Sequence, residues 1–379
     1  MKKIIRATTV PQSLETFCNG MLKELSKDYE VVALSSPGES LEVVRTREGV
    51  RVIPVKMERH ISPWNDLKSL LSLVKVFRKE RPDMVHSMTP KAGLLCMIAA
   101  WLTRVPVRVH TFTGLVFPTS TGLTRRVLML TDKITCACAT HVTPEGEGVK
   151  NDLIVNKITK KPLKVLGYGN VRGVDMSWYD RTPEVERAAS ELVDKTRLTF
   201  LFVGRIVRDK GINELVSAYE ALRADYPGIR LFLVGPNEDN LDPIDDSTRK
   251  IIESDESISA TGSKKGVDLL AYYAASDCFV FPSYREGFPN TVLEAGAMGL
   301  PSIVTDINGS REIIRDGYNG LIVPPRDSKA LGDAMRVLLE DRSRLDAMAS
   351  VARKHIADHY DQTFVRKCLY EFYNQILPA

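Results

Sequence analysis

Short apolar runs rich in Val and Ile alternate with helix-period segments along most of the chain. This alternation is typical of βαβ units, in which parallel strands are joined by helices that cover the sheet. In the first half, the pattern predicts strands over residues 3–8, 30–34, 50–53, 84–86, 107–110, 133–138 and 163–165. It predicts helices between them, over residues 14–25, 65–80 and 91–102. The first half is therefore expected to form one doubly wound α/β domain.

The alternation starts again after a turn-rich stretch, residues 167–173, and a charged helix around residues 184–193. Strands are predicted over residues 198–203, 229–234, 278–281, 302–305 and 320–323, and the last helical stretch, 343–376, is interrupted around 359–361. We expect two Rossmann-like doubly wound domains, over residues 1–176 and 177–356, with a C-terminal helix, about 357–379, that packs back on the first. Ligands bind at the carboxyl ends of strands in open α/β sheets, so the site is expected in a cleft between two facing domains.

Composition excludes several classes of protein. The 379 residues are 44% hydrophobic and 26% charged, as in an ordinary globular protein and unlike collagen-like, disordered or disulfide-stapled chains. The longest apolar stretch, residues 92–102, is shorter than the roughly 20 residues that a membrane-spanning helix needs. The N-terminus lacks the apolar core of a signal peptide, so a cytoplasmic protein is expected. The six cysteines have no paired CxxC spacing and are expected to be reduced thiols.

The formal net charge of +4 conceals a difference between the two halves. Residues 1–178 contain 27 Lys and Arg against 16 Asp and Glu, a net charge of +11, and the remainder contains 25 against 32, a net charge of −7. A basic half attracts nucleic acid, an anionic membrane surface or a phosphorylated substrate, and it is also compatible with a solvated surface that has no partner. Nucleic-acid binding is not expected, because the sequence shows no basic surface with interleaved aromatic residues.

The most informative segment, residues 281–299, runs from a buried strand through a turn into a helix rich in small residues. Asn290 is expected to be the N-cap and Thr291 to lie in the first turn, so that backbone amides and the positive helix end face the strand terminus. Glu286 and Glu294 flank this anion site, and carboxylates accept paired hydrogen bonds from sugar hydroxyls. The alternative is that Glu294 complements the helix dipole and Glu286 is a solvated loop residue.

Two cationic residues follow another predicted strand. The strand ends at Gly204, and Arg205 and Lys210 lie on the connection to the next helix. Both side chains can converge on a diphosphate and stabilise the negative charge that develops on a leaving nucleotide. Surface Arg and Lys residues are common, so it is their place at the carboxyl end of a strand that favours a functional role.

These motifs, together with the stretches 306–314 and 316–325, resemble those of the retaining glycosyltransferases of family 4, which have the two-domain GT-B fold. The resemblance implies that Arg205 and Lys210 bind the diphosphate of the donor, Glu286 its sugar and Glu294 its ribose. The donor-binding residues that it implies are Gly204, Arg205, Lys210, Glu286, Gly287, Phe288, Asn290, Thr291 and Glu294. Pro289 has no amide hydrogen and can only shape the turn.

The first half matches the family less tightly, through the segments that begin at His86 and His110. His110 is expected to end a strand and to point toward the substrates, where it would hydrogen-bond a sugar or an acceptor phosphate; a structural role is the alternative. The resemblance thus implies Arg205, Lys210, Glu286 and His110 as the catalytic residues. Residues 10–14 depart from the family, whose members often carry a glycine pair on this loop.

The nearest subgroup is the CapM-type enzymes of bacterial capsule and surface polysaccharides, judged by residues 87–91, 110–114 and 167–175. This resemblance implies a nucleotide-sugar donor, with uridine as the favoured base, and a polyprenyl-diphosphate-linked sugar as acceptor. The basic first half agrees with peripheral binding to the anionic inner face of the cell membrane. The candidate basic residues are Lys68, Lys75, Arg78, Lys79, Arg125 and Arg126.

No Asp-x-Asp motif stands at the end of a predicted strand, so neither a metal nor another cofactor is expected. Arg205, Lys210 and the helix end would then handle the charge of the leaving group. The resemblance implies transfer with retention of anomeric configuration. Two alternatives remain open: a sugar-nucleotide 2-epimerase of the same architecture, and a non-enzymatic, two-lobed sugar-binding protein.

Overall fold

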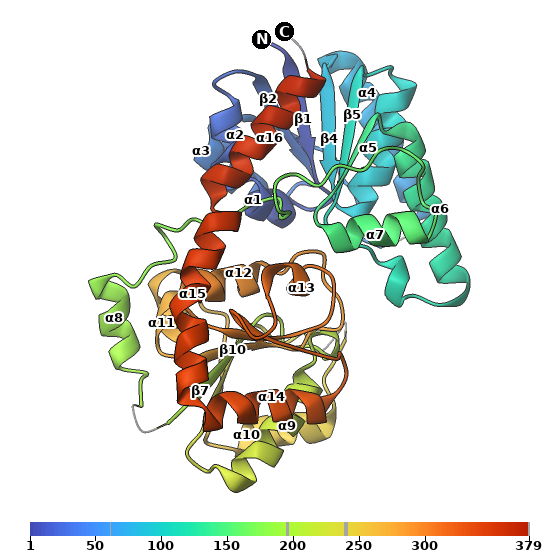
Figure 1. Cartoon of the computed structure of the whole chain (residues 1–379). Helices are drawn as coiled ribbons and strands as arrows, with labels where there is room; N and C mark the ends of the chain where they lie inside the picture. Colours follow the sequence, from blue (N-terminus) through green and yellow to red (C-terminus); the bar gives the residue numbers. More distant parts are fainter. Residues whose placement is uncertain (61, 195–196, 239–241, 378–379) are drawn as a thin grey trace. The chain divides into compact units, whose positions relative to one another are not determined.

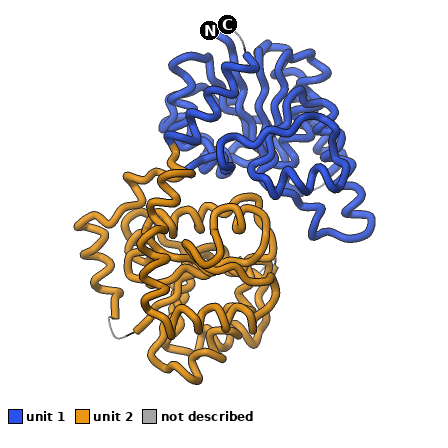
Figure 2. The backbone as a smooth tube through the Cα atoms, in the orientation of Figure 1, with its two compact units in different colours: residues 1–173, 363–379 blue, residues 174–362 orange. Residues whose placement is uncertain are grey.

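The chain forms two compact units (Figure 2), and each is built around its own parallel sheet. The computed structural model describes residues 1–60, 62–194, 197–238 and 242–377. Unit 1 comprises residues 1–173 and 363–379, and unit 2 comprises residues 174–362. Each unit has a six-stranded sheet with helices, which confirms the expectation of two Rossmann-like folds (Figure 1).

In unit 1, the strands are β1 (Lys3–Ala7), β2 (Glu30–Ser35), β3 (Arg51–Pro54), β4 (Met84–Met88), β5 (Val107–Phe112) and β6 (His141–Pro144). The helices are α1 (Pro11–Phe17), α2 (Met21–Leu25), α3 (Glu39–Glu48), α4 (Pro63–Glu80), α5 (Pro90–Leu102), α6 (Gly122–Cys138), α7 (Glu147–Val155) and α16 (Gln362–Ile376), with a 3₁₀ turn η1 (Phe117–Thr119). The strand order is β3-β2-β1-β4-β5-β6, so the direction of winding reverses between β1 and β4.

In unit 2, the strands are β7 (Thr199–Val203), β8 (Arg230–Val234), β9 (Ile258–Gly262), β10 (Cys278–Phe281), β11 (Ser302–Thr305) and β12 (Gly320–Val323). The helices are α8 (Pro183–Ser190), α9 (Ile212–Asp225), α10 (Asp246–Ser254), α11 (Gly266–Ala274), α12 (Asn290–Ala297), α13 (Ser310–Ile313), α14 (Ser328–Glu340) and α15 (Arg342–Tyr360), with a 3₁₀ turn η2 (Arg208–Lys210). The strand order, β12-β11-β10-β7-β8-β9, again places the first strand of the unit in the middle of the sheet.

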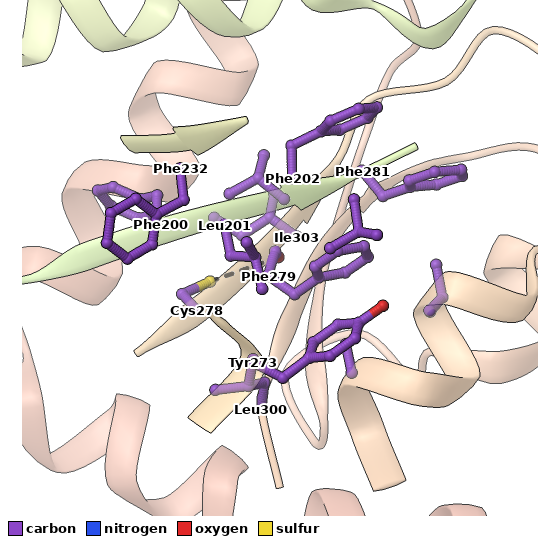
Figure 3. Close-up of a cluster of buried hydrophobic side chains, with 14 of the residues drawn as sticks. Phe200, Leu201, Phe202, Phe232, Tyr273, Cys278, Phe279, Phe281, Leu300 and Ile303 are labelled. Atoms are coloured by element: carbon purple, nitrogen blue, oxygen red, sulfur yellow. Dashed lines mark hydrogen bonds between the residues drawn. The ribbon is translucent and has the colours of Figure 1, made fainter. Parts of the chain in front are cut away.

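Aromatic side chains from the central strands fill the core of unit 2 (Figure 3). The Phe281 ring lies parallel to those of Phe202 and Phe279, with 6.0 Å between centroids in each pair. All residues of β7 and β10 are buried, as expected for central strands covered on both faces. This packing fixes the ends of the two strands, from which the loops that carry Lys210 and Glu286 emerge.

The core of unit 1 includes the end of the chain. Helix α16 contributes Leu369, Phe372 and Tyr373 to the same buried cluster as Ile4 on β1 and Met84 on β4. The Tyr373 ring is fully buried and packs against the ring of His86 with 5.8 Å between centroids. The last helix is therefore an integral layer of unit 1.

Several predicted elements are wrong. Residues 133–138 belong to helix α6, where Ile134 is exposed while Thr135 and Cys136 are buried, which follows the helical period. The strand at this position is β6, which begins at His141. Residues 163–165 make only an isolated bridge, between Leu163 and Val142.

Three further boundaries differ from the expectation. The helix predicted over 14–25 is two helices, because Gly20 takes a left-handed conformation (φ 71°) between them. Strand β5 continues to Phe112, so His110 does not end it. Helix α12 begins at Asn290 itself with Pro289 as N-cap, one residue before the predicted start.

Candidate active site

Two loops at the carboxyl ends of β7 and β10 lie in close contact in unit 2. Gly211 has a φ of 72°, and a Cβ at this position would lie 2.1 Å from the carbonyl oxygen of Pro282. Only glycine satisfies both constraints at the start of α9. The backbone amide of Tyr284 donates to the carbonyl oxygen of Asp209 at 2.9 Å. This contact brings Lys210, on the first loop, to Glu286, on the second.

Lys210 and Glu286 form an ion pair at the end of the sheet. Their side chains are only 14% and 19% exposed, so solvent screens the pair weakly. The fully buried Ser283 hydroxyl lies 3.1 Å from Glu286 Oε1, to which it donates. The ammonium group also lies 5.7 Å from the centre of the Phe281 ring. The pair is therefore held in one orientation, and Glu286 is not a solvated loop residue.

Arg205 lies on the same loop as Lys210 and has a different partner. Its Nη1 lies 2.7 Å from Glu238 Oε2, and the side chain is 43% exposed. Partial burial alone would lower the pKa of Arg205, but the ion pair with Glu238 raises it above its ordinary value. The negative charges of Asp209 and Glu286 raise the pKa of Arg205 further, because both carboxylates lie near enough to interact with the guanidinium.

The loop before α12 is clamped by a neighbouring turn. Gly309 has a φ of 73°, and a Cβ there would lie 2.6 Å from the Gly287 carbonyl oxygen and 2.7 Å from Phe288 Cα. Phe288 is 5% exposed, and its ring packs against Tyr360 at 5.5 Å between centroids. The start of α12, with Asn290 and Thr291 in its first turn, is thereby fixed relative to β10. Such a helix start carries partial positive charge.

Glu294 lies one turn further along α12. Its side chain is 7% exposed, and Oε2 accepts a hydrogen bond of 3.1 Å from the hydroxyl of the fully buried Tyr273. A carboxylate that merely complements the helix dipole has no need of this burial, since buried acids require partners. The structure therefore places Lys210 and Glu286 together, with Arg205 and Glu294 on the flanking elements.

His110 occupies the interior of unit 1. It is 1% exposed, and Nδ1 lies 2.9 Å from the Ser87 hydroxyl. A Cβ at Gly93 on α5 would lie 2.3 Å from His110 Cε1, so the helix packs directly on the ring. Burial lowers the pKa of His110 to about 3, which keeps the ring neutral at pH 7.

The sequence interpretation missed residues that position the predicted ones: Asp209, Glu238, Tyr273 and Ser283. Asp209 lies within the motif next to Lys210, and its buried Oδ1 has no hydrogen-bond partner among the described residues. Ser283 immediately follows β10, and this position at a strand end was the available signal. Nothing in the sequence pattern indicated Tyr273 or Glu238, because their contacts join elements distant along the chain.

Within the ranges that the structure describes, no group of three or more His, Cys, Asp and Glu side chains is arranged to hold a metal ion. Among the same residues, no helix is both long and apolar enough to cross a bilayer.

Two family models match the chain, one in each half. Residues 14–169 match the model described as "Glycosyl transferase 4-like domain", and residues 185–355 match "Glycosyl transferases group 1". The capsular polysaccharide biosynthesis glycosyltransferase CapM of Staphylococcus aureus is 32% identical over 99% of this chain and 98% of its own. An Escherichia coli UDP-Gal:alpha-D-GlcNAc-diphosphoundecaprenol alpha-1,3-galactosyltransferase is 29% identical over 80% of this chain and 78% of its own.

Solved structures share the fold over the whole length. HepE of Anabaena, crystallised in complex with UDP, has a TM-score of 0.82 and 17% identity over 99% of this chain and all of its own. WaaG, described as a glycosyltransferase involved in lipopolysaccharide biosynthesis, has a TM-score of 0.74 and 15% identity and covers both chains completely. The epimerase and the non-enzymatic binding protein are not supported. The chain belongs to the family 4 glycosyltransferases and is an enzyme of this class with the GT-B fold.

Proposed function

We propose that this glycosyltransferase moves a sugar from a UDP-sugar to a polyprenyl-diphosphate-linked saccharide, with retention of anomeric configuration, during synthesis of a capsule or another surface polysaccharide. The S. aureus relative is named for capsular polysaccharide biosynthesis, and the E. coli relative for a UDP-sugar and a diphosphoundecaprenol acceptor. The observation that carries the proposal is the Lys210–Glu286 ion pair, held by Ser283 at the ends of β7 and β10.

In this proposal, two cationic side chains stabilise the leaving group. Arg205 and Lys210 bind the diphosphate, which approaches the backbone at Gly204 and the start of α12. The partial positive charge of the helix end and two fixed cations stabilise the charge that develops as the nucleotide departs. The proposed phosphate and sugar contacts lie along the loop and first turn at Gly287, Phe288, Asn290 and Thr291.

Two glutamates are proposed to bind the two sugars of the donor, the transferred sugar and the ribose, which lie on either side of the diphosphate. Glu286 is proposed to accept hydrogen bonds from the transferred sugar, and the more deeply placed Glu294 from the ribose. The ion pair with Lys210 orients Glu286 before a donor binds, and such preorganisation lowers the cost of binding.

The transfer itself needs no metal in this proposal. The bond between the anomeric carbon and the diphosphate oxygen breaks, and the acceptor oxygen forms its bond on the same face of the sugar. The acceptor proton passes to the departing phosphate oxygen. His110 is proposed to act on the acceptor side as a neutral hydrogen-bonding group. A ring with a pKa of about 3 carries no extra proton near pH 7 and cannot act as a general acid there.

Binding to an anionic membrane is proposed through the surface formed by α4 and α6, which both pack against α5 (Figure 1). Large apolar side chains project from it: Trp64 (80% exposed), Leu71 (61%), Leu123 (75%) and Leu130 (57%). Basic side chains accompany them: Lys68, Lys75, Arg78, Lys79 and Arg126 are exposed, while Arg125 is bonded to Asn156. A groove beside α4 is lined by Lys56, Lys68 and Lys75. Apolar anchors among cations fit an acidic lipid surface.

The proposed function is tested by incubating the purified protein with a panel of UDP-sugars and a synthetic polyprenyl-diphosphate-linked sugar. We expect one UDP-sugar to give a lengthened lipid-linked product, in which the anomeric configuration of the donor is retained. Interconversion of the donor without acceptor would instead identify an epimerase. Inversion at the anomeric carbon would contradict the proposed mechanism.

A further inference from the structure

Unit 1 contains a partly open cavity of about 30 Å³ that the proposed donor chemistry does not use. It lies at the carboxyl ends of β1, β4, β5 and β6, where Arg6, Met88, Thr111 and Thr143 line it. Arg6 is in register with His86 on the neighbouring strand, and the winding of the sheet reverses between these two strands. Ligands of doubly wound sheets bind at such reversal points.

The Arg6 guanidinium is 1% exposed. Its Nη1 donates to His86 Nδ1 at 2.8 Å and to the Tyr373 hydroxyl at 2.7 Å. Among the residues that the structure describes, its Nη2 contacts only sulfur atoms, Cys18 Sγ at 3.8 Å and Met88 Sδ at 3.3 Å, and the buried Nε has no hydrogen-bond partner. No carboxylate in the described part of the chain forms an ion pair with it. A buried charge is strongly destabilising unless an anion compensates it.

The polar side chains around Arg6 hydrogen-bond to one another. Burial, reinforced by the charge of Arg6, lowers the pKa of His86 well below its ordinary value, so the ring is neutral. Because a guanidinium only donates, Nδ1 of His86 accepts, and the proton on Nε2 is donated to Thr111 Oγ1 at 2.7 Å. The Thr111 hydroxyl then donates to Thr143 Oγ1 at 2.6 Å. These hydrogen bonds join neutral groups, so none of them supplies a counter-charge to Arg6.

We propose that the cavity binds a phosphate-type oxyanion, with Arg6 as its counter-charge. The guanidinium N–H groups that have only sulfur or no partner are the available donors, and this group is suited to oxyanions. Glu145, 4% exposed, also lines the cavity. A carboxylate there accepts a hydrogen bond from the P–OH group of hydrogen phosphate, which sulfate cannot offer.

Two sources share this chemistry: free phosphate, and the diphosphate of a lipid-linked acceptor. The second source rests on the proposed function, and the first does not. Glu145 favours the free ion, because a diphosphate esterified at both ends has no P–OH group.

The test is thermal unfolding of the full chain in phosphate-free buffer, with inorganic phosphate, sulfate and a short-chain prenyl-diphosphate-linked sugar as separate additions. We expect phosphate to raise the Tm, sulfate to raise it less, and Arg6→Met to abolish the phosphate effect. Without phosphate, Arg6→Met should be at least as stable as the native protein, since an apolar residue of similar length removes an uncompensated charge. Arg45→Met, which changes an exposed residue of α3, should keep the full phosphate response.

Equal responses to phosphate in the native protein and Arg6→Met would overturn the proposal, as would no response to either phosphate or the prenyl-diphosphate sugar. A response to the prenyl-diphosphate sugar alone, lost in Arg6→Met, would assign the site to the acceptor. Equal effects of sulfate and phosphate would remove the role of Glu145. If Arg6→Met fails to fold, Arg6→Lys, which keeps a cation but loses the planar fork, should bind phosphate at least tenfold more weakly. Assays of UDP binding and sugar transfer on the same samples test the proposed function separately.

Discussion

Lys210 and Glu286 form one ion pair but are proposed to bind different parts of the donor, the diphosphate and the sugar. The two roles can therefore be tested by separate substitutions. Glu286→Gln and Lys210→Ala should each reduce turnover at least about 100-fold, which corresponds to about 3 kcal/mol of transition-state stabilisation. Steady-state transfer assays measure this. Arg208→Ala is the matched control, because this neighbour of Lys210 is paired with Asp245 on the surface and should leave turnover unchanged. Unimpaired transfer in both site variants would reject the assignment of the site.

Glu294 is expected to act on binding rather than on chemistry. Glu294→Gln keeps the shape of the side chain but removes the charge that would accept both ribose hydroxyls, so the Kd for UDP should rise about tenfold, equivalent to about 1.4 kcal/mol. Tyr273→Phe removes the hydrogen bond to Glu294 and should weaken UDP binding less, since the carboxylate remains. Calorimetric titration with UDP measures both. An unchanged Kd in Glu294→Gln would show that this residue does not hold the ribose.

The buried state of His110 makes the stability of unit 1 sensitive to acid. Burial lowers its pKa from 6.5 to about 3, so between these values the unfolded chain binds a proton that the folded chain does not. Stability should therefore fall as the pH falls through this window, by up to about 1.4 kcal/mol per pH unit. His110→Gln lacks this titration, and its Tm should fall less steeply between pH 6.5 and 4. Parallel slopes in the two proteins would contradict a buried, neutral His110.

At the scale of elements, the turn around Gly309 positions the loop that precedes α12. Gly309→Ala would place a methyl group 2.6 Å from the Gly287 carbonyl oxygen, so the loop must move. We expect a several-fold higher KM for the donor and a lower Tm. Gly317→Ala is the control, because its φ of 75° imposes the same left-handed strain of about 1 kcal/mol while open space surrounds the added methyl group. Equal donor KM values in the two variants would show that the clamp does not serve donor binding.

The elements that the sequence predicts best are central parallel strands. Strands such as β10 and β11 are buried at every position, because both faces are covered, and their predicted limits are confirmed. Strand β9 was missed because it lies at the edge of its sheet and carries the polar alternation of Ile258 to Gly262. In α6, an apolar and β-branched stretch suggested a strand, but packing against α5 makes it a helix.

For the candidate site too, the sequence indicates residues with a local signal and misses residues placed by contacts between distant segments. Arg205, Lys210 and Glu286 were proposed as site residues because they lie on the loops that follow strands β7 and β10, so their order along the chain indicates where they lie in the fold. Glu238 and Tyr273 act through contacts between distant segments, which no local pattern encodes. Arg6 was not recognised because a single charged residue within a short strand usually faces solvent, whereas here α16 supplies Tyr373 to cover it.

At the scale of the whole molecule, the charge difference between the halves predicts that membrane binding and donor binding depend differently on salt. The half with a net charge of +11 carries the proposed membrane surface, whose cations are exposed and act through a field that salt screens. The proposed donor site lies in the half with a net charge of −7, so its affinity must come from local groups such as Lys210, which is 14% exposed. Binding to vesicles and binding to UDP should therefore respond differently to salt.

Raising the ionic strength from about 0.01 M to about 1 M shortens the Debye length from about 30 Å to about 3 Å. Over this range, we expect sedimentation with phosphatidylglycerol vesicles to be largely lost, while the Kd for UDP changes far less. At low salt, Leu123→Glu should weaken vesicle binding, because it places a charge among the apolar anchors, whereas Val337→Glu on α14 should not. Vesicle binding that persists at high salt and survives Leu123→Glu would mean that the α4 and α6 surface is not what meets the lipid, and that the excess of positive charge in this half serves only the anionic acceptor.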